Sequence, residues 1–154
     1  MARSRRHGEQ PRVREAAAQR YAPEAQVPPL TGVLFDSDVI IEVLRGNPEI
    51  VDAVAVLEAS GTPTYCSPIN WAEIYAGIRP GEEAVTDAFF RARGEVLLDA
   101  EVGRKAGAYL ARHAASRGVR IADALIAAAA TSAGLRLWTL NRRHYPMEDL
   151  AFYE

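Results

Sequence analysis

The stretch Gly32-Val-Leu-Phe-Asp36 is a short apolar run that ends at an acidic residue, which is the pattern of a buried β-strand. Residues 37–45 follow with five large aliphatic side chains at helical density, and Gly46-Asn47-Pro48 then breaks the helix. A buried strand that leads directly into a helix is typical of a parallel sheet whose faces are covered by helices.

The rest of the chain repeats this alternation. Strands are predicted over residues 63–66, 95–98 and 135–140, with an edge strand over 150–153 as a fifth. Helices are predicted over residues 48–59, 68–78, 82–93, 100–116 and 121–133. The expected fold is therefore α/β, with three layers (α/β/α) around a central, mainly parallel sheet of four or five short strands.

Length and composition limit the classes of protein to consider. A chain of 154 residues predicts one folded domain. The lone Cys66 excludes an intrachain disulfide and a cysteine-rich zinc module, and it fits a reducing cytosol. No apolar stretch reaches the ~20 residues that a membrane span requires. We therefore expect a cytoplasmic protein without membrane contact.

Charge divides the chain at about residue 30. Residues 1–30 carry six Arg, three Glu and four Pro with few large apolar side chains, so we expect a flexible basic extension before a folded domain over residues 31–154. The extension is either an arm that touches RNA or a partner, or a dispensable addition. The domain itself has 12 basic and 17 acidic side chains, so a polyanion would need a local basic patch or a cation to approach it.

Four acidic side chains stand in long segments that otherwise carry no charge: Asp36, Asp38, Glu73 and Asp123. A buried, unpaired carboxylate is costly, so such groups meet a cation, hydrogen bonds or one another. Several carboxylates that converge repel one another unless a divalent ion lies between them. Oxygen ligands of this kind suit Mg²⁺ and Mn²⁺.

These side chains can reach one edge of the sheet. Asp36 ends the first predicted strand and Asn141 follows the last long one, and sites in open α/β sheets form at the carboxyl ends of parallel strands. Glu73 lies midway along a helix, and Asp123 lies in the first turn of an Ala-rich helix. Each residue also has a local explanation: Asp36 and Asp38 as helix caps, Asp123 through the helix dipole, and Asn141 as a turn residue.

Four segments together resemble the PIN-domain ribonucleases that are the toxins of VapC-type toxin–antitoxin pairs. The segments are residues 33–40 (VLFDSDVI), 67–77 (SPINWAEIYAG), 121–128 (IADALIAA) and 137–141 (LWTLN). The family has acids at the positions of Asp36, Glu73 and Asp123, and Asp or Asn at that of Asn141. Asp38 stands where Asn or Ser is usual. The resemblance covers residues 31–154.

The resemblance implies a PIN-like fold and a metal-dependent ribonuclease that hydrolyses RNA phosphodiester bonds. The implied catalytic residues are Asp36, Glu73, Asp123 and Asn141. Of these, Asp36 and Asp123 would hold Mg²⁺ or Mn²⁺. Asp38 and Thr139 would lie next to these ligands without binding the ion. The implied RNA contacts are Arg79, Arg142, Arg143 and His144. The implied partners are a cognate antitoxin protein and a second copy of the chain in a homodimer.

Two other functions compete with this interpretation. Phe35-Asp36-Ser-Asp38-Val resembles the first motif of haloacid-dehalogenase-type phosphatases, although the single Lys105 lies in a long amphipathic helix and no later acidic pair for magnesium follows. A non-catalytic module on the PIN fold, acting through a partner, would keep the same residues without activity.

Overall fold

The computed structural model describes residues 30–154, so the predicted flexible extension lies outside the described residues except for Leu30. Four strands form one wholly parallel sheet in the order β3-β2-β1-β4. They are β1 (Gly32–Phe35), β2 (Thr64–Cys66), β3 (Gly94–Glu95) and β4 (Leu135–Trp138). The predicted α/β class with a parallel sheet is confirmed.

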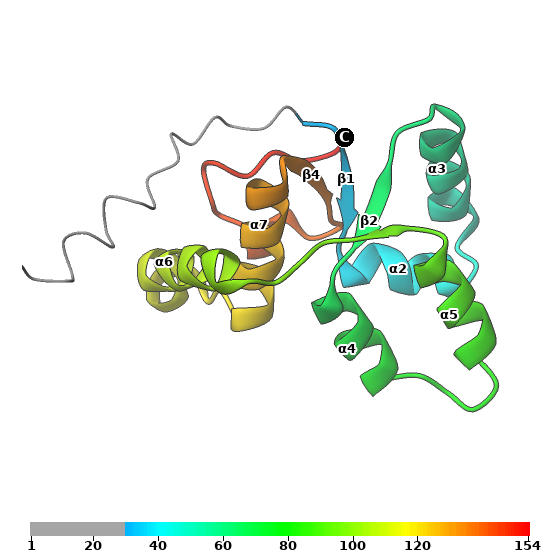
Figure 1. The fold of residues 1–154 in the computed structure, drawn as a ribbon. Helices are drawn as coiled ribbons and strands as arrows, with labels where there is room; N and C mark the ends of the chain where they lie inside the picture. The colour runs from blue at the N-terminus through cyan, green and yellow to red at the C-terminus, as the bar shows by residue number, and fades with distance from the viewer. Residues whose placement is uncertain (1–29) are drawn as a thin grey trace, which may run out of the picture.

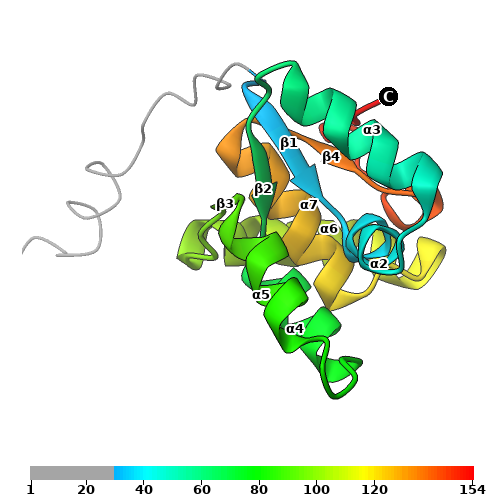
Figure 2. The same cartoon turned by 90° about the vertical axis from the view of Figure 1, so that its right-hand side faces the viewer.

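Helices cover both faces of this sheet (Figure 1). The helices on one face are α6 (Ala100–Arg117) and α7 (Ile121–Ala133). Those on the other face are α2 (Ser37–Leu44), α3 (Pro48–Ala59), α4 (Pro68–Ala76) and α5 (Glu83–Arg91). Figure 2 shows α4 and α5 side by side beyond the end of β2. Within residues 30–154, no helix combines the length and the apolar character needed to cross a membrane.

The strand β1 lies at the centre of the core, and all four of its residues are buried. Leu34 packs towards α6 and α7, whereas Val33 and Phe35 pack towards the helices of the opposite face. Small side chains let α7 lie close to the sheet, since Ala124, Ala127, Ala128 and Ala130 are fully buried. Strand β1 therefore holds its carboxyl end rigidly between two layers of helices.

Local sequence sets most helix ends where they were expected. Asp36, Asn47 and Ser67 are the N-caps of α2, α3 and α4, and each accepts a hydrogen bond from a backbone N–H of its helix. Gly118 and Gly134 end α6 and α7 in the left-handed conformation that glycine adopts without a steric penalty.

The sheet edges differ from the prediction. β3 covers Gly94–Glu95 instead of residues 95–98, and the side chain of Leu97 is 80% exposed. The predicted edge strand over 150–153 is reduced to an isolated parallel bridge between Leu137 and Phe152. Short apolar runs at an edge resemble strands in sequence, but only pairing decides whether they become strands.

The amino end of β1 passes so close to β2 and the residue before it that Gly32 has no room for a side chain. A Cβ on Gly32 would stand 2.7 Å from the Pro63 carbonyl oxygen and 2.8 Å from the Tyr65 ring. We expect Gly32→Ala to lower the free energy of unfolding by about 1–3 kcal/mol, because backbone has to move. Gly103→Ala on α6, where nothing lies within 4 Å, should raise it by about 0.5–1 kcal/mol. Urea denaturation of both variants would measure this, and equal effects would contradict the packing argument.

Candidate active site

The candidate site lies where β1 and β4 end. The chain runs from β1 to β2 and β3 on one side and returns as β4 on the other, which makes this edge a topological switch point. The Asp36 N–H donates to the Trp138 carbonyl oxygen over 2.8 Å, so the ladder between the two strands continues into the site. Residues after β1 and after β4 are thereby held side by side.

Asp36 is held from both sides. Its side chain is 8% exposed, and its Oδ1 accepts from the Ser37 N–H at 2.8 Å while its Oδ2 accepts from the Thr139 hydroxyl at 2.8 Å. Burial raises the pKa of Asp36 and the charge of Asp123 adds to this, although the donors Thr139, Tyr145 and Ser37 oppose the shift. The carboxylate has a fixed orientation and an excess of negative charge around it.

Asp123 brings the second buried carboxylate from the first turn of α7. It is 7% exposed, and its Oδ2 accepts from the Arg120 N–H at 3.2 Å, at the N-cap of the helix. The Arg120 Nε lies 3.9 Å from the same oxygen. Asp123 thus has the first-turn position that the helix dipole favours, and its charge also acts on Asp36.

Asp38 joins the loop after β1 to the loop after β4. Its Oδ1 accepts from the Val39 N–H at 2.7 Å, and its Oδ2 accepts from the Leu140 N–H at 3.0 Å and faces the Thr139 hydroxyl at 3.2 Å. Burial and the charge of Asp36 raise the pKa of Asp38 to about 6, against the hydrogen bonds from Leu140 and Val39. Asp38 thus helps to fix the position of Thr139, but it also adds a third carboxylate that repels Asp36.

This raised pKa predicts how the stability of the metal-free protein depends on pH. The folded chain keeps a proton on Asp38 up to about pH 6, whereas the unfolded chain releases it near 3.8. The folded state thus binds more protons in this window, and the Asp38 contribution to stability falls as pH rises from about 4 to 6. Asp38→Asn should remove this component. Urea denaturation in EDTA across the window would test it, and a constant difference between variant and wild type would count against it.

Glu73 reaches the site through a chain of hydrogen bonds that is partly buried at Glu73 and buried beyond it. Its Oε2 accepts from the Ser37 hydroxyl at 2.5 Å, and the Ser37 oxygen accepts from the Asn70 Nδ2 at 2.9 Å. The Asn70 Oδ1 in turn accepts from the Ser67 N–H and hydroxyl at 2.7 and 2.8 Å. Because Ser67 occupies the amide oxygen, the Asn70 NH₂ must face Ser37, and the Ser37 hydrogen must point at Glu73.

The remaining predicted residues lie further out. The Asn141 N–H donates to the Thr139 Oγ1 at 3.1 Å, but its side chain faces His144 and Arg143. Arg142 contacts the C-terminal segment, donating to the Tyr153 carbonyl oxygen at 3.2 Å with its guanidinium over the Phe152 ring. Arg79 and Glu73 line the same cavity of about 220 Å³ between α2, α4 and α5.

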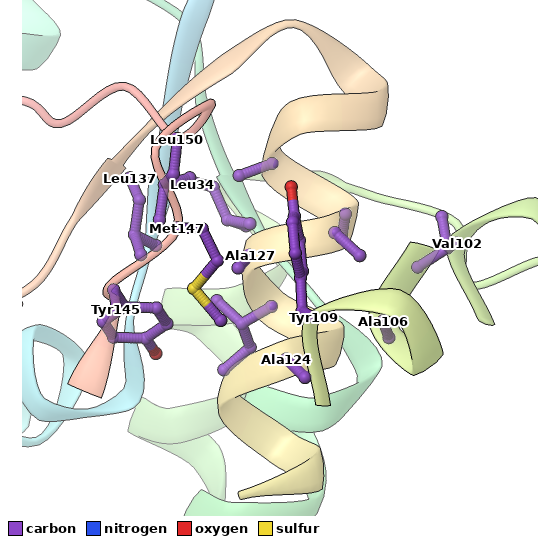
Figure 3. Close-up of a cluster of buried hydrophobic side chains, with 14 of the residues drawn as sticks. Leu34, Val102, Ala106, Tyr109, Ala124, Ala127, Leu137, Tyr145, Met147 and Leu150 are labelled. Atoms are coloured by element: carbon purple, nitrogen blue, oxygen red, sulfur yellow. The ribbon is translucent and has the colours of Figure 1, made fainter. Parts of the chain in front are cut away.

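Sequence reasoning missed three polar side chains of this region. Ser37 and Asn70 hold Glu73, and Tyr145, which packs in the apolar cluster shown in Figure 3, has a pKa raised by burial and by the charge of Asp36. The position of Asn70 three residues before Glu73 on an apolar helix was the available signal, because such residues share a helix face. Nothing in the local sequence distinguished Tyr145 from a core aromatic.

The donor set fits a divalent cation that takes few protein ligands. Among residues 30–154, neither Asp36 nor Asp38 has an ion-pair partner, so the site has unbalanced negative charge. In the same part of the chain, no three His, Cys, Asp or Glu side chains stand together as a complete metal-binding group. Mg²⁺ suits such a site because it keeps several waters and takes one or two carboxylates together with substrate phosphates.

Comparison with known proteins agrees with this arrangement. The family model described as "PIN domain" matches residues 33–151. Ribonuclease VapC19 of Mycobacterium tuberculosis is 35% identical over 115 residues, which covers 74% of this chain and 92% of that protein. Ribonuclease VapC10 of the same organism is 34% identical over 119 residues, covering 75% and 86%.

Solved structures show the same fold at lower identity. The DNA-bound VapBC of Salmonella typhimurium aligns with a TM-score of 0.68 and 22% identity over 80% of this chain and 98% of that one. A toxin–antitoxin complex from Klebsiella pneumoniae aligns with a TM-score of 0.65 and 23% identity over 80% and 99%. The PIN domain model matches the chain from β1 to the segment beyond β4, and so includes both strands that form the candidate site. The chain belongs to the PIN domain family.

Proposed function

We propose that the chain is a metal-dependent ribonuclease that hydrolyses RNA phosphodiester bonds and is the toxin of a toxin–antitoxin pair. The observation that carries this proposal is the pair of buried carboxylates at the switch point: within residues 30–154 Asp36 has no ion-pair partner, and Asp123 has the exposed Arg120 at 3.9 Å. The family membership and the names of the two relatives, both ribonucleases, support it.

In this proposal Asp36 and Asp123 hold Mg²⁺ or Mn²⁺. When bound, the ion supplies charge neutralisation at the scissile phosphate and lowers the pKa of water. Thr139 and Asp38 keep the Asp36 carboxylate in its orientation through the hydrogen bonds described above. Glu73 has one oxygen occupied by Ser37, which leaves Oε1 to orient the attacking water.

RNA reaches this acidic site along its basic rim. Arg79 lines the cavity that also contains Glu73, so we propose it as a phosphate contact. Arg143 and Asn141 are neighbours at the end of β4 and extend the rim. Arg142 is a weaker candidate for a phosphate contact, because its guanidinium already contacts Tyr153 and Phe152.

The proposed partners follow from the relatives. The structural neighbours are described as toxin–antitoxin complexes, so we propose a cognate antitoxin protein as the inhibitor of this chain. We also propose a homodimer, which light scattering of the purified protein would measure. We also propose that the protein acts in the cytoplasm, on RNA. The folded unit is residues 31–154, as the extent of the matched model supports.

Cleavage of a total RNA pool tests the proposal. Purified protein is incubated with Mg²⁺ or Mn²⁺ and, in parallel, with EDTA. An Asp36→Ala/Asp123→Ala variant purified in the same way controls for a contaminating nuclease. The proposal predicts cleavage that needs the metal and is lost in the double variant. Equal cleavage by both proteins would indicate contamination and withdraw the support.

A non-catalytic PIN module is the alternative, and it has a distinct signature. Such a module would bind the cation through Asp36 and Asp123 yet leave every RNA pool intact, while still binding its partner. The phosphatase alternative has lost its basis, because the chain belongs to the PIN domain family and not to the dehalogenase type.

A further inference from the structure

Within residues 30–154, Arg120 is the only basic residue that forms an ion pair with a carboxylate of the candidate site. Its Nε lies 3.9 Å from the Asp123 Oδ2. Over the same residues Asp36, Asp38 and Glu73 form no ion pair. Arg120 was not among the RNA contacts predicted from the sequence, so its place beside the second buried carboxylate needs an explanation.

Arg120 has a fixed backbone and a solvent-exposed side chain. Its N–H donates to the Asp123 Oδ2 at 3.2 Å, and its carbonyl oxygen accepts from the Ala124 N–H at 3.0 Å. The side chain is 73% exposed, so the guanidinium lies in water at the edge of the site. An exposed ion pair of this length is weak, because water and salt screen it. The guanidinium can therefore exchange the Asp123 carboxylate for another anion.

Arg120 and a divalent cation compete for the same carboxylate. Two positive charges beside Asp123 repel each other, so a cation bound by Asp36 and Asp123 weakens the attraction that holds the Arg120 guanidinium there. An RNA substrate offers this guanidinium a phosphate at the same edge of the site. The planar guanidinium can donate two parallel hydrogen bonds to two phosphate oxygens, which makes a phosphate a better partner than one oxygen 3.9 Å away.

We propose that Arg120 is a phosphate contact of the RNA substrate, and that its guanidinium exchanges Asp123 for an RNA phosphate when the site is loaded with metal. This inference rests on the proposed function. Arg120 begins α7, whereas Arg79 follows α4, and these helices pack on opposite faces of the sheet (Figure 1). An RNA strand that crosses the carboxylates would then have a basic contact on each side.

Arg120→Gln tests the proposal, because it removes the charge and keeps the backbone hydrogen bonds. Calorimetry without RNA should show a dissociation constant for Mn²⁺ that is roughly two- to fivefold lower, since the competing charge is gone. For a short single-stranded RNA that wild type cleaves, KM should rise roughly fivefold with kcat unchanged. The slope of log KM against log NaCl concentration should fall by about 0.7, the value for one phosphate contact on a single strand.

Arg120→Lys and Arg104→Gln are the controls. The lysine variant keeps the charge, so its Mn²⁺ affinity and its salt slope should stay close to those of wild type. Arg104 on α6 is also exposed and forms no ion pair among the described residues, and its replacement should leave both quantities unchanged. The melting temperature of every variant in EDTA should stay within about 2 °C of wild type, because exposed charges contribute little to stability.

The outcomes separate this inference from the proposed function. An unchanged Mn²⁺ affinity or an unchanged salt slope in Arg120→Gln would overturn the phosphate contact, as would equal changes in Arg104→Gln. If wild type binds no Mn²⁺ or cleaves no RNA, the proposed function fails and this inference fails with it. If wild type does both and Arg120→Gln behaves as wild type does, this inference fails alone.

Discussion

Replacing Asp36 by Asn is expected to abolish RNA cleavage and to leave the metal-free fold at least as stable as wild type. Asn keeps an oxygen for the Ser37 N–H, and its NH₂ can donate to the Thr139 hydroxyl, so the local hydrogen bonds survive. The charge that burial and Asp123 oppose is gone, which removes a cost to folding. Loss of a metal ligand should lower the cleavage rate by at least about 10³-fold.

The measurement pairs the rate of RNA cleavage with urea denaturation in EDTA. Asp52→Asn, on the exposed face of α3, is the control and should change neither quantity. Wild-type cleavage by the Asp36 variant would remove this residue from the site. If the variant lost both activity and stability, Asp36 would be a residue that stabilises the fold and not one that acts in cleavage.

Replacing Asn70 by Ala is expected to destabilise the fold more than any other single loss of a polar side chain at a helix cap. Asn70 is fully buried, and its amide completes the capping box of α4 while donating to Ser37. Its removal leaves the Ser67 donors and the Ser37 oxygen without that partner inside the core. We expect a loss of about 2–4 kcal/mol in the free energy of unfolding.

Asn47→Ala is the control for this prediction. Asn47 is also a cap, at the start of α3, but its site is partly exposed and water can replace the lost bonds to Glu49 and Glu42. Its removal should cost about 1 kcal/mol. Urea denaturation compares the two variants, and an equal cost would contradict a special role for the buried amide. Cleavage per folded molecule should also fall in Asn70→Ala, because Ser37 no longer has a fixed direction towards Glu73.

Local sequence was sufficient for the elements that turns and caps delimit. The helix α3 could be predicted because Asn47 and Pro48 open it and Gly61 follows its end. The edge strand β3 was misplaced because its two residues take their strand geometry from pairing with β2, and no periodicity develops over two positions. The parts of the sheet that depend on long-range pairing were the parts that the sequence specified least.

The candidate site also contains residues that local sequence reveals and residues that it does not. Asp36 and Asp123 were predictable because a lone charge in an apolar segment has few structural uses. Ser37, Asn70 and Tyr145 were not, because small polar and aromatic side chains are common on surfaces and in cores alike. Their roles depend on which residues lie opposite, and those residues come from segments far along the chain.

Asp36 and Thr139 share a hydrogen bond although they stand 103 positions apart. During synthesis on the ribosome, β1 therefore emerges long before β4. Until β4 is made, Asp36 lacks both the Trp138 carbonyl that fixes its backbone and the Thr139 hydroxyl that orients its carboxylate. Contacts between such distant segments also form late in folding. A nascent chain that has not passed residue 139 thus carries the first acid of the candidate site without the hydroxyl that orients it.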